Sequence, residues 1–519
     1  MQKYYPVIGI EVHAELKTNS KMFCACKNDA DETRPNVNIC PVCMAHPGTL
    51  PVPNKKAIES VIKVGLAIDG TIANFSEFDR KNYFYPDIPK GYQISQYKYP
   101  IVSGGHLADF AITRIHLEED TANSKHLPTG QAGDKGYSLI DYNRAGVPLM
   151  ELVTEAHMFD SVENASKATS TFGRELQLLL TYLGVSEANM EKGEMRVEAN
   201  MSLTEGSVLE ANGLAPIVGH IDLATYKPAL GIKVEVKNLN SFRSVERAII
   251  FEMNRMQKLI EEGRGGELVQ ETRGWDEAKQ STYSQRTKED AHDYRYFPEP
   301  DIPKFYLHEM FDLENLKSGL AETPAEKRAR FGSDYGIKSE DIESYINDTT
   351  LGNYFESVAQ NLNPLPASPL SRGGENAETS NSSGIFQILS NYLTSDFVGL
   401  NKTNPSITFP SAPHMAELVT LFANGDISSR VAKDLLARIA VSDTSPKQIA
   451  ENEDLYQKND TEGLKVLAQK MIDENPEVVA TYKSGKENAI MSLVGKIIKE
   501  SNGSANPQLA LQTLKDLLK

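Results

Sequence analysis

All four cysteines of this 519-residue chain lie in one short segment, and their spacing limits what that segment can fold into. They form a C-x-C pair and a C-x2-C pair separated by a 13-residue loop: Cys24, Cys26, Cys40 and Cys43. Two close thiol pairs of this kind suit a closed, tetrahedral structural zinc site, and the metal would hold a loop too small to fold by itself. Four buried, unpaired thiols are the alternative. A catalytic zinc is disfavoured, because four thiolates leave no open position.

Composition narrows the class of protein. Four cysteines in a chain of this length do not suggest a secreted disulfide framework, and the start MQKYYPVIGIEVHAEL has no leader-like charged and apolar regions. No apolar run reaches the ~18 residues that span a bilayer, so we expect a cytoplasmic protein without membrane contact. The net charge of −17 argues against a free-standing, non-specific nucleic-acid binder, although one local patch could still contact RNA.

The pattern of apolar residues changes along the chain. Residues 1–303 mix short alternating strands, such as PVIGIEVHAEL and GIKVEVKNLNSF, with amphipathic helices such as KKAIESVIKVGLAI. Because strands and helices do not alternate regularly, we expect an α+β domain rather than a doubly wound parallel sheet. From residue 304 the pattern is polar and helical. The Pro-, Ser-, Asn- and Gly-rich segment 362–384 is interpreted as a flexible linker, and residues 385–519 as helices with a locally basic end.

Carboxylates and histidines recur inside short apolar strands. In IGIEVHAEL the apolar residues fall on one strand face, while Glu11, His13 and Glu15 fall on the other. Similar sets occur in RIHLEED, DYNRAGVPLMELV and MRVEANMSL. Bare carboxylates are costly to bury, so these groups should be paired, hydrogen-bonded or bound to metal. An oxygen-rich set with one imidazole suits Mg²⁺ or Mn²⁺ and favours phosphoryl transfer from ATP; surface salt bridges are the alternative.

Two further stretches bear on the chemistry. In ITRIHLEED, Glu119 shares a strand face with Ile115 and Leu117, which predicts that its carboxylate points toward the core. The tyrosine-rich stretch FDRKNYFYPDIPKGYQISQYKYPI carries Lys81 and Lys90. It is interpreted either as a surface that binds a nucleotide or an RNA end, or as an amphipathic loop packed on the domain. No P-loop, GxSxG elbow or amidase signature is present, so no hydrolytic nucleophile is expected.

Taken together, these motifs closely resemble the B subunit of the aspartyl/glutamyl-tRNA amidotransferase, the GatB family. The resemblance rests on IGIEVHAEL, SKMFCAC, CPVCMAHPGTLPVPN, RKNYFYPDIPKGYQISQ, RIHLEED, DYNRAGVPLMELV, KNLNSFRSVERAI, ETRGWDEAK and DYRYFPEPDIP, in this order from residue 7 to about 303. In the tail, GDISSRVAKDLL and YKSGKENAIMSLVGKIIKESNGSANPQLALQTLKDLL are similar to the family's YqeY-type domain. The resemblance implies a cradle-like catalytic domain with a mainly antiparallel sheet over 1–303, a helical domain over 304–414 and a small helical tail domain over 415–519 that contacts tRNA.

The resemblance also implies a function. The chain would be one subunit of a heterotrimer, an ATP-dependent carbon–nitrogen ligase with glutamine as amide donor. The A subunit, a glutaminase, would release ammonia into a channel, and a C subunit would complete the assembly. With ATP and Mg²⁺, the B subunit would phosphorylate the side-chain carboxylate of Glu on tRNA(Gln), or of Asp on tRNA(Asn). Ammonia would then displace the phosphate and give the amide.

Site residues follow by the same resemblance. Five residues match the positions of the Mg²⁺ and kinase site: Glu11, His13, Glu118, Glu119 and Glu151. The expected catalytic residues are Glu118 and Glu119, with Lys81 and Lys90 near the active site and the channel mouth. The four cysteines match the family's zinc motif.

The sequence departs from the family's motifs at two places, and it leaves two alternative functions open. In MRVEAN, Val197 and Glu198 replace the usual Cys and Asp, and CMAHPG replaces the usual Cys-Leu-Gly-x-Pro-Gly. One rival is a self-contained amide ligase that uses free ammonia. The other is a non-enzymatic RNA-binding scaffold, which the carboxylates disfavour because a scaffold does not need acids beside a nucleic acid.

Overall fold

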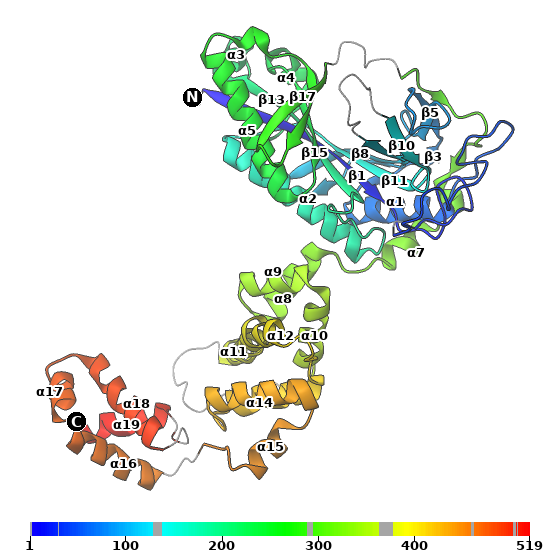
Figure 1. Cartoon of the computed structure of the whole chain (residues 1–519). Helices are drawn as coiled ribbons and strands as arrows, with labels where there is room; N and C mark the ends of the chain where they lie inside the picture. The colour runs from blue at the N-terminus through cyan, green and yellow to red at the C-terminus, as the bar shows by residue number, and fades with distance from the viewer. Residues whose placement is uncertain are drawn as a thin grey trace. The chain divides into compact units, whose positions relative to one another are not determined.

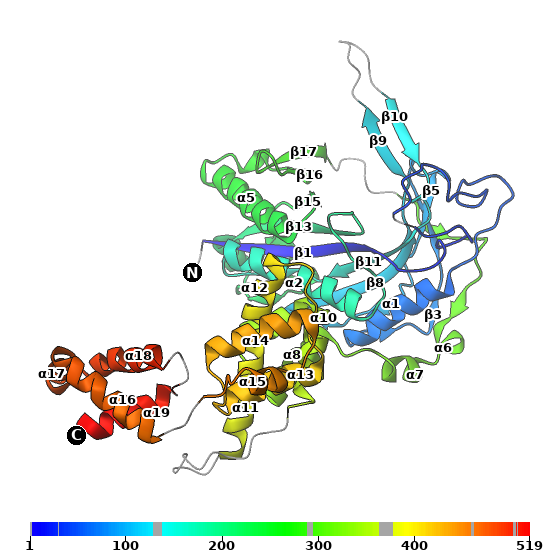
Figure 2. The same ribbon diagram turned by 60° about the horizontal axis from the view of Figure 1, so that its bottom comes forward.

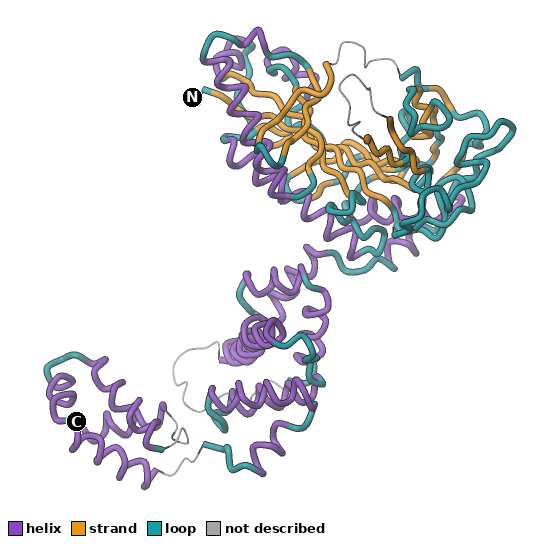
Figure 3. The backbone as a smooth tube through the Cα atoms, in the orientation of Figure 1, coloured by secondary structure: helices purple, strands orange, loops and turns teal. Residues whose placement is uncertain are grey.

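The structure is a computed structural model of the whole chain (Figure 1). It describes residues 3–29, 31–127, 137–287, 294–362, 377–457, 461–501, 505 and 507–518. The chain divides into two compact units, Met1–Pro324 and Ala325–Lys519. The described strands all lie in the first unit, whereas the described elements of the second are helices (Figure 3).

A large, mainly antiparallel sheet forms the body of the first unit. Its central strand, β1 (Tyr4–Glu15), lies between β11 (Pro148–Thr154) and β13 (Met195–Glu205) and runs antiparallel to both. The strand order is β17-β16-β15-β13-β1-β11-β8-β6-β2, and among the described pairs β15 and β16 alone run in parallel. The other strands are β2 (Thr71–Ile72), β6 (Val102–Ser103), β7 (His106–Leu107), β8 (Phe110–Glu119), β12 (His157–Met158), β14 (Gly219–His220), β15 (Val234–Leu239), β16 (Glu271–Asp276) and β17 (Ser281–Thr287). The predicted α+β class is confirmed.

Three long helices cover one face of this sheet: α1 (Lys55–Ala67), α2 (Val162–Tyr182) and α5 (Phe242–Glu261) (Figure 1). Each begins at a side-chain cap, in which the oxygen of Asn54, Ser161 or Ser241 accepts a backbone N–H of the first turn. Beneath the helices, β1 buries alternate residues, and Ile10 and Val12 are 0% exposed. The polar residues of β1 therefore lie on the opposite face, which we call the open face of the sheet.

Short strands form three smaller sheets in this unit, β9 with β10, β4 with β5 and β18, and β3 with β19. They are β3 (Phe75–Ser76), β4 (Asp79–Asn82), β5 (Tyr92–Ser95), β9 (Asn123–Leu127), β10 (Tyr137–Asp141), β18 (Phe297–Pro298) and β19 (Phe305–Tyr306). The hairpin of β9 and β10 projects from the body of the unit (Figure 2). The end of the unit is tied back to β4, because the guanidinium of Arg80 makes two 2.7 Å hydrogen bonds to the carboxylate of Glu299. This pair fixes the strand that carries Lys81.

Small helices complete the first unit: α3 (Gly206–Ala211), α4 (Leu223–Tyr226), α6 (Leu307–Met310) and α7 (Leu313–Ser318). The second unit consists of α8 (Pro324–Tyr335), α9 (Ser339–Asn347), α10 (Thr349–Ala359), α11 (Ala377–Asn391), α12 (Val398–Thr403), α13 (Ala412–Ala423), α14 (Ser429–Ser442), α15 (Pro446–Asn452), α16 (Thr461–Glu474), α17 (Pro476–Lys483), α18 (Ile490–Glu500) and α19 (Pro507–Leu518).

The second unit has an aromatic centre and a separate cluster near the C-terminus. Phe331, Tyr345 and Phe355 lie within 5.8 Å of one another, measured between ring centroids. Leu493 and Leu514, both 0% exposed, belong to the C-terminal apolar cluster formed by α16, α18 and α19. Of the linker predicted over 362–384, residues 363–376 lie outside the described residues, and α11 begins at Ala377. Within the described parts of the chain, no helix combines the length and apolar character needed to cross a membrane.

Replacing Phe172 by alanine should destabilise the first unit by about 3–5 kcal/mol, because its ring is 0% exposed and packs edge-to-face on Phe110. Trp275, the one tryptophan of the chain, lies in the same unit, so its fluorescence during urea unfolding reports on that unit. Thr171→Ala, at the exposed neighbouring position of α2, is the matched control and should change the stability by less than about 0.5 kcal/mol. A loss below about 1 kcal/mol for Phe172→Ala would contradict the described packing.

Candidate functional site

The register of β1 and its neighbours sets a row of charged groups on the open face. His13 lies directly opposite Glu151 of β11, and Glu151 lies opposite His116 of β8. Residues opposite each other in adjacent strands project from the same face. The Nε2 atoms of His13 and His116 each lie 3.3 Å from Oε2 of Glu151, and Oε1 of Glu118 lies 3.7 Å from Nε2 of His13. We call His13, His116, Glu118 and Glu151 the imidazole cluster.

The imidazole cluster favours positive charge at its centre. Burial acts to lower the pKa of His13, but Glu151, Glu198 and Glu118 raise this pKa to about 9. Burial acts to raise the pKa of Glu151, but His116 and His13 hold it well below the usual range. Nδ1 of both histidines is buried without a hydrogen-bond partner. The cluster therefore offers a cation two carboxylates and an imidazole that can release its proton when the cation binds.

A second cluster, here called the acid triad, lies next to the first one. Glu11 of β1 is directly opposite Glu198 of β13, and Glu235 comes from β15. One carboxylate oxygen from each of the three lies within 4.8 Å of the others. Burial and the neighbouring carboxylates of Glu151, Glu198 and Glu235 raise the pKa of Glu11. Nζ of Lys237 lies 2.7 Å from Glu198 and 3.1 Å from Glu235 and offsets part of this repulsion.

Both clusters border one pocket of about 600 Å³, which we call the acidic pocket. Its lining residues are Glu11, His13, Lys81, Tyr83, Tyr85, Glu151, Glu198, Lys233, Glu235, Lys237, Gln270, Thr272, Gln285 and Tyr294. Nζ of Lys81 lies 5.3 Å from the ring centroid of Tyr294 and 5.9 Å from that of Tyr83. Burial acts to lower the pKa of Lys81, but Glu118 and Glu151 raise it. The pocket thus pairs acids from its sheet strands with lysines and tyrosines, a donor set that suits a polyphosphate and a divalent cation.

Glu119 lies elsewhere, although it directly follows Glu118. It shares its strand face with Ile115 and Leu117 and is 5% exposed, so the predicted direction of its side chain is confirmed. Its carboxylate accepts a 2.7 Å hydrogen bond from Nζ of Lys90 and a 2.9 Å bond from the backbone N–H of Ile94. Glu119 therefore projects from the face of β8 opposite to that of His116 and Glu118, and it lines a different pocket.

The four cysteines come together as a thiol cluster. Their sulfurs all lie within 4.8 Å of one another, no disulfide joins them, and Sγ of Cys40 and Cys43 are 3.9 Å apart. Four sulfurs around Zn²⁺ with bonds of ~2.3 Å would be about 3.8 Å apart. A hydrogen bond from Cys24, supported by the ammonium of Lys21, lowers the pKa of Cys43 to about 5 despite its burial. The cluster therefore fits a soft metal ion and favours the thiolate form at one sulfur.

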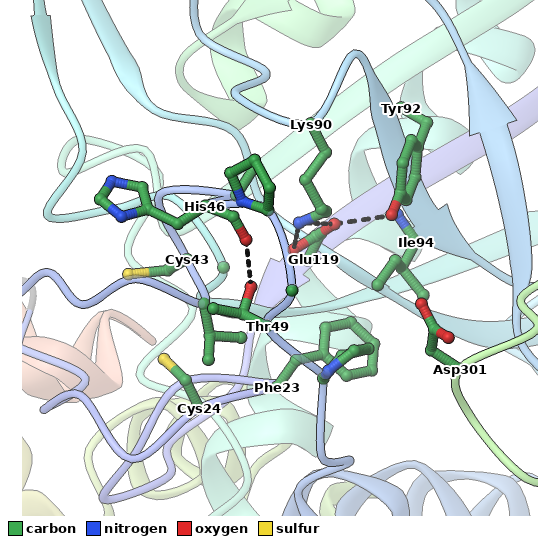
Figure 4. A pocket seen from close by; sticks show the side chains of 16 residues that line it. Phe23, Cys24, Cys43, His46, Thr49, Lys90, Tyr92, Ile94, Glu119 and Asp301 are labelled. Carbon is green, nitrogen blue, oxygen red and sulfur yellow. Dashed lines mark hydrogen bonds and ion pairs between the residues drawn. The ribbon is translucent and has the colours of Figure 1, made fainter.

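The cysteine loop and Glu119 share one small pocket of about 250 Å³ (Figure 4). Cys24 and Cys43 line it together with Lys90 and Glu119. Gly146 lies between these groups with φ +83°, and a Cβ there would stand 3.7 Å from Cβ of Cys43 and 3.9 Å from Oε2 of Glu119. These distances are ordinary van der Waals contacts, so the positive φ of this turn, and not a lack of space, is what favours glycine here.

Of the five residues expected to bind Mg²⁺, the structure brings His13, Glu118 and Glu151 into one cluster. It sets Glu11 in the acid triad and Glu119 in the cysteine-loop pocket. Lys81 borders the acidic pocket and Lys90 pairs with Glu119.

The sequence placed His116 among the candidate hard ligands of RIHLEED, although not in the final metal set, and it did not assign Glu235 or Lys237 to the site. His116 stands in RIHLEED, and Glu235 and Lys237 alternate in GIKVEVKNLN. The period of 2 in these strands was the available signal, but it does not identify the strand that lies next to β13.

The structure shows the surroundings of the residues that depart from the family pattern. Val197 is 1% exposed and belongs to the apolar core. Glu198 points to the open face and reaches Lys237 with its carboxylate. In CMAHPG, Ala45 takes the left-handed conformation, with φ 57°, where the usual motif has glycine. An alanine there costs about 1–2 kcal/mol relative to a residue without a Cβ.

The sheet, the acidic pocket and the thiol cluster define the class of protein. Residues 6–311 match the family model of the GatB/GatE catalytic domain, and residues 377–518 match the GatB domain model of the YqeY type. The chain belongs to the GatB family.

Relatives similar over their full length carry the name of the B subunit of aspartyl/glutamyl-tRNA(Asn/Gln) amidotransferase. One from Caldanaerobacter subterraneus subsp. tengcongensis is 40% identical, covering 99% of both chains. One from Thermotoga maritima is 39% identical, also over 99% of both, and one from Picosynechococcus sp. is 36% identical over 100% of this chain and 98% of its own. The predicted family is confirmed.

A thiol titration distinguishes a metal-bound cluster from four free thiols. If the cluster holds a metal, a disulfide reagent should find fewer than one reactive thiol in the native protein, because metal-bound thiolates are protected. All four should react once a strong chelator and denaturant are added, and about one equivalent of metal should be released. Rapid reaction of all four in the native protein, with no metal released, would leave the alternative of unpaired thiols.

Proposed function

We propose that this chain is the B subunit of a tRNA-dependent amidotransferase, an ATP-dependent carbon–nitrogen ligase with glutamine as amide donor. It acts in a heterotrimer with a glutaminase A subunit and a C subunit. Its substrates are Glu on tRNA(Gln), Asp on tRNA(Asn), or both, and the products are Gln-tRNA(Gln) and Asn-tRNA(Asn) for translation. The observation that carries this proposal is the acidic pocket, in which two clusters of acids and histidines meet three lysines in a chain of this family.

The reaction explains why acids and lysines, rather than a nucleophile, line the pocket. A side-chain carboxylate is a poor electrophile, so one of its oxygens first attacks the γ-phosphorus of ATP and ADP leaves. The nitrogen of ammonia then attacks the activated carbonyl carbon, inorganic phosphate leaves, and a proton is lost to give the amide. The protein's task is to orient two anions against each other and to offset their charge.

Each group of the acidic pocket has a place in this task. The imidazole cluster and the acid triad would hold Mg²⁺, which supplies charge neutralisation for the phosphates when bound. The triad offers oxygens only and suits Mg²⁺ well, and the imidazole cluster adds nitrogen donors. Lys81, whose pKa is raised despite its burial, stays positive and orients an anionic oxygen.

Glu119 and Lys90 are proposed to serve the ammonia side. Ammonia is mostly ammonium near neutral pH and must lose a proton before it attacks. Glu119 is buried, anchored by the N–H of Ile94 and paired with Lys90, so its carboxylate is held ready to accept that proton. The position of this pair outside the acidic pocket agrees with a second route of entry.

The thiol cluster is proposed to bind a structural Zn²⁺. The oxygen of Asn143 accepts the N–H groups of both Val37 and Asn38, and the carboxylate of Asp141 accepts that of Asn36. These bonds hold the 13-residue loop between the cysteine pairs. The metal would therefore fix the wall beside Glu119 and need not take part in the reaction.

The three predicted domains remain part of this proposal. The catalytic domain would extend over 1–303, the helical domain over 304–414 and the tRNA-binding tail over 415–519. The tail has its own apolar cluster, and residues 483–519 carry six lysines against three acids. Such a balance favours contact with the phosphates of tRNA.

Reconstitution tests the function directly. With A and C partners, glutamine, ATP and Mg²⁺, the chain should convert Glu-tRNA(Gln) to Gln-tRNA(Gln) or Asp-tRNA(Asn) to Asn-tRNA(Asn). Glu119→Gln should lower amidation about 100-fold or more and leave glutamine hydrolysis by the complex intact. Glu210→Gln, an exposed position on α3, is the matched control. No amidation by a well-assembled trimer would refute the proposal, and amidation of a free acid by this chain alone would favour the self-contained ligase.

Divalent-cation binding should depend on pH because of His13. With a pKa of about 9 in the metal-free protein, His13 releases a proton when the cation binds, so the affinity for Mn²⁺ should rise with pH. Between about pH 6.5 and 8 the slope should approach about tenfold per pH unit and flatten toward about pH 9. Titration followed by electron spin resonance measures this affinity.

Two variants make the pH test specific. His13→Gln should bind Mn²⁺ more weakly and with little pH dependence, and Glu151→Gln should lose at least about tenfold in affinity. Glu210→Gln should behave as the unaltered chain. A pH-independent affinity, or an unaffected Glu151→Gln, would remove the imidazole cluster from the metal assignment.

A further inference from the structure

Lys21 is a buried lysine that the proposed reaction does not use. It is 1% exposed and is among the largest fully buried side chains of the described residues. Its Nζ donates a 3.0 Å hydrogen bond to the carbonyl oxygen of Tyr142 and lies 3.9 Å from Sγ of Cys43. Within the described parts of the chain, no carboxylate forms an ion pair with it. Because a buried ammonium without an anionic partner costs several kcal/mol, this charge requires another counter-ion.

The thiol cluster is the group that can supply this negative charge. Cys43 is the one buried cysteine of the four, and its sulfur also accepts the backbone N–H of Cys40 at 3.1 Å. Four neutral thiols carry no charge, whereas four thiolates around Zn²⁺ keep two net negative charges. The ammonium of Lys21 therefore favours the metal-bound cluster over the metal-free one. Its burial strengthens this attraction, because little water screens it.

We propose that Lys21 is the counter-charge that stabilises the metal-bound thiol cluster. This inference rests on the proposed function, which includes a structural Zn²⁺ at the four cysteines. When the metal binds, the thiol protons leave, and the ammonium of Lys21 offsets part of the negative charge that remains on sulfur. Lys21 is thus a positioning residue, since it acts through the cysteines and not on a substrate.

The same lysine connects the thiol cluster to the wall beside Glu119. Its Nζ holds the carbonyl at the start of the turn 142–146, and the N–H of Met22 holds the carbonyl of Gly146 at the end of this turn, at 2.7 Å. The N–H of Gly146 in turn donates a 2.9 Å hydrogen bond to the carbonyl of Asp120, which directly follows Glu119. Loss of the metal or of the ammonium should therefore loosen the turn that borders Glu119.

Removal of the charge tests the assignment. Lys21→Met keeps an unbranched apolar stem and lacks the ammonium, so competition with a chromogenic chelator should show an affinity for Zn²⁺ that is lower by about tenfold or more. Lys27→Met is the matched control, because Lys27 adjoins Cys26 in the same loop but its side chain is 69% exposed. The affinity of this control should stay within about twofold of the unaltered chain. In the assembled heterotrimer, excess Zn²⁺ should restore amidation by Lys21→Met.

The metal-free chain distinguishes a charge effect from a packing effect. Methionine has no charge to desolvate, so Lys21→Met should not lower the urea midpoint of the metal-free chain, followed by the fluorescence of Trp275. Three results would overturn the proposal: an unchanged affinity for Zn²⁺, an equal loss of affinity in Lys27→Met, and a metal-free chain destabilised as much as the metal-bound one. An unaltered chain that binds no Zn²⁺ would refute the structural metal itself, so the two failures are distinguishable.

Amine labelling tests the same assignment on the unaltered chain and decides the matter if Lys21→Met does not fold. An acylating reagent should modify Lys27 in the zinc-bound chain and leave Lys21 unmodified. After a chelator removes the metal, Lys21 should become reactive, while the rate at Lys27 stays the same. Equal modification of Lys21 with and without Zn²⁺ overturns the proposal.

Discussion

The register of β1 between β11 and β13 is the constraint on which the site depends. Strand β1 buries Ile8, Ile10 and Val12 beneath the helices, and its period of two then sends Glu11 and His13 to the open face. A slip of one residue would bury the charges and expose the apolar side chains, which the hydrophobic effect opposes strongly. The helix-covered core thus fixes where the acids lie. Their mutual repulsion is the cost, and Lys237 and Lys81 offset part of it.

Much of this arrangement could be predicted from the sequence because it depends on local periodicity. The strand around Glu11 and His13 and the inward direction of Glu119 follow from alternation in short segments. The α+β class follows from the irregular order of strands and helices, and the mainly antiparallel sheet was implied by the family resemblance. The close approach of the four cysteines follows from their spacing along the chain. These features need no knowledge of which strands are neighbours.

What could not be predicted depends on pairing between distant strands. Glu235 and Lys237 join the site because β15 pairs with β13, and the pattern GIKVEVKNLN does not identify its partner. Likewise, Glu118 and Glu119 stand together in the sequence, yet β8 sends one toward the imidazole cluster and the other toward Lys90 and the cysteine loop. One rigid strand therefore serves two pockets, so a displacement of β8 would alter both at once.

The ion pair between Arg80 and Glu299 has a consequence for the order in which the first unit folds during synthesis. The two residues are 219 positions apart. Strand β4, which carries Lys81, pairs with β18, and β18 lies in this late part of the chain. During synthesis the ribosome releases β1, β4 and β11 long before residue 299 emerges. Strand β4 therefore cannot pair with β18 until this late segment has been synthesised, and the acidic pocket is completed near the end of the folding of this unit. A nascent chain halted before Glu299 would carry all the acids of the two clusters but would lack the pairing that fixes β4.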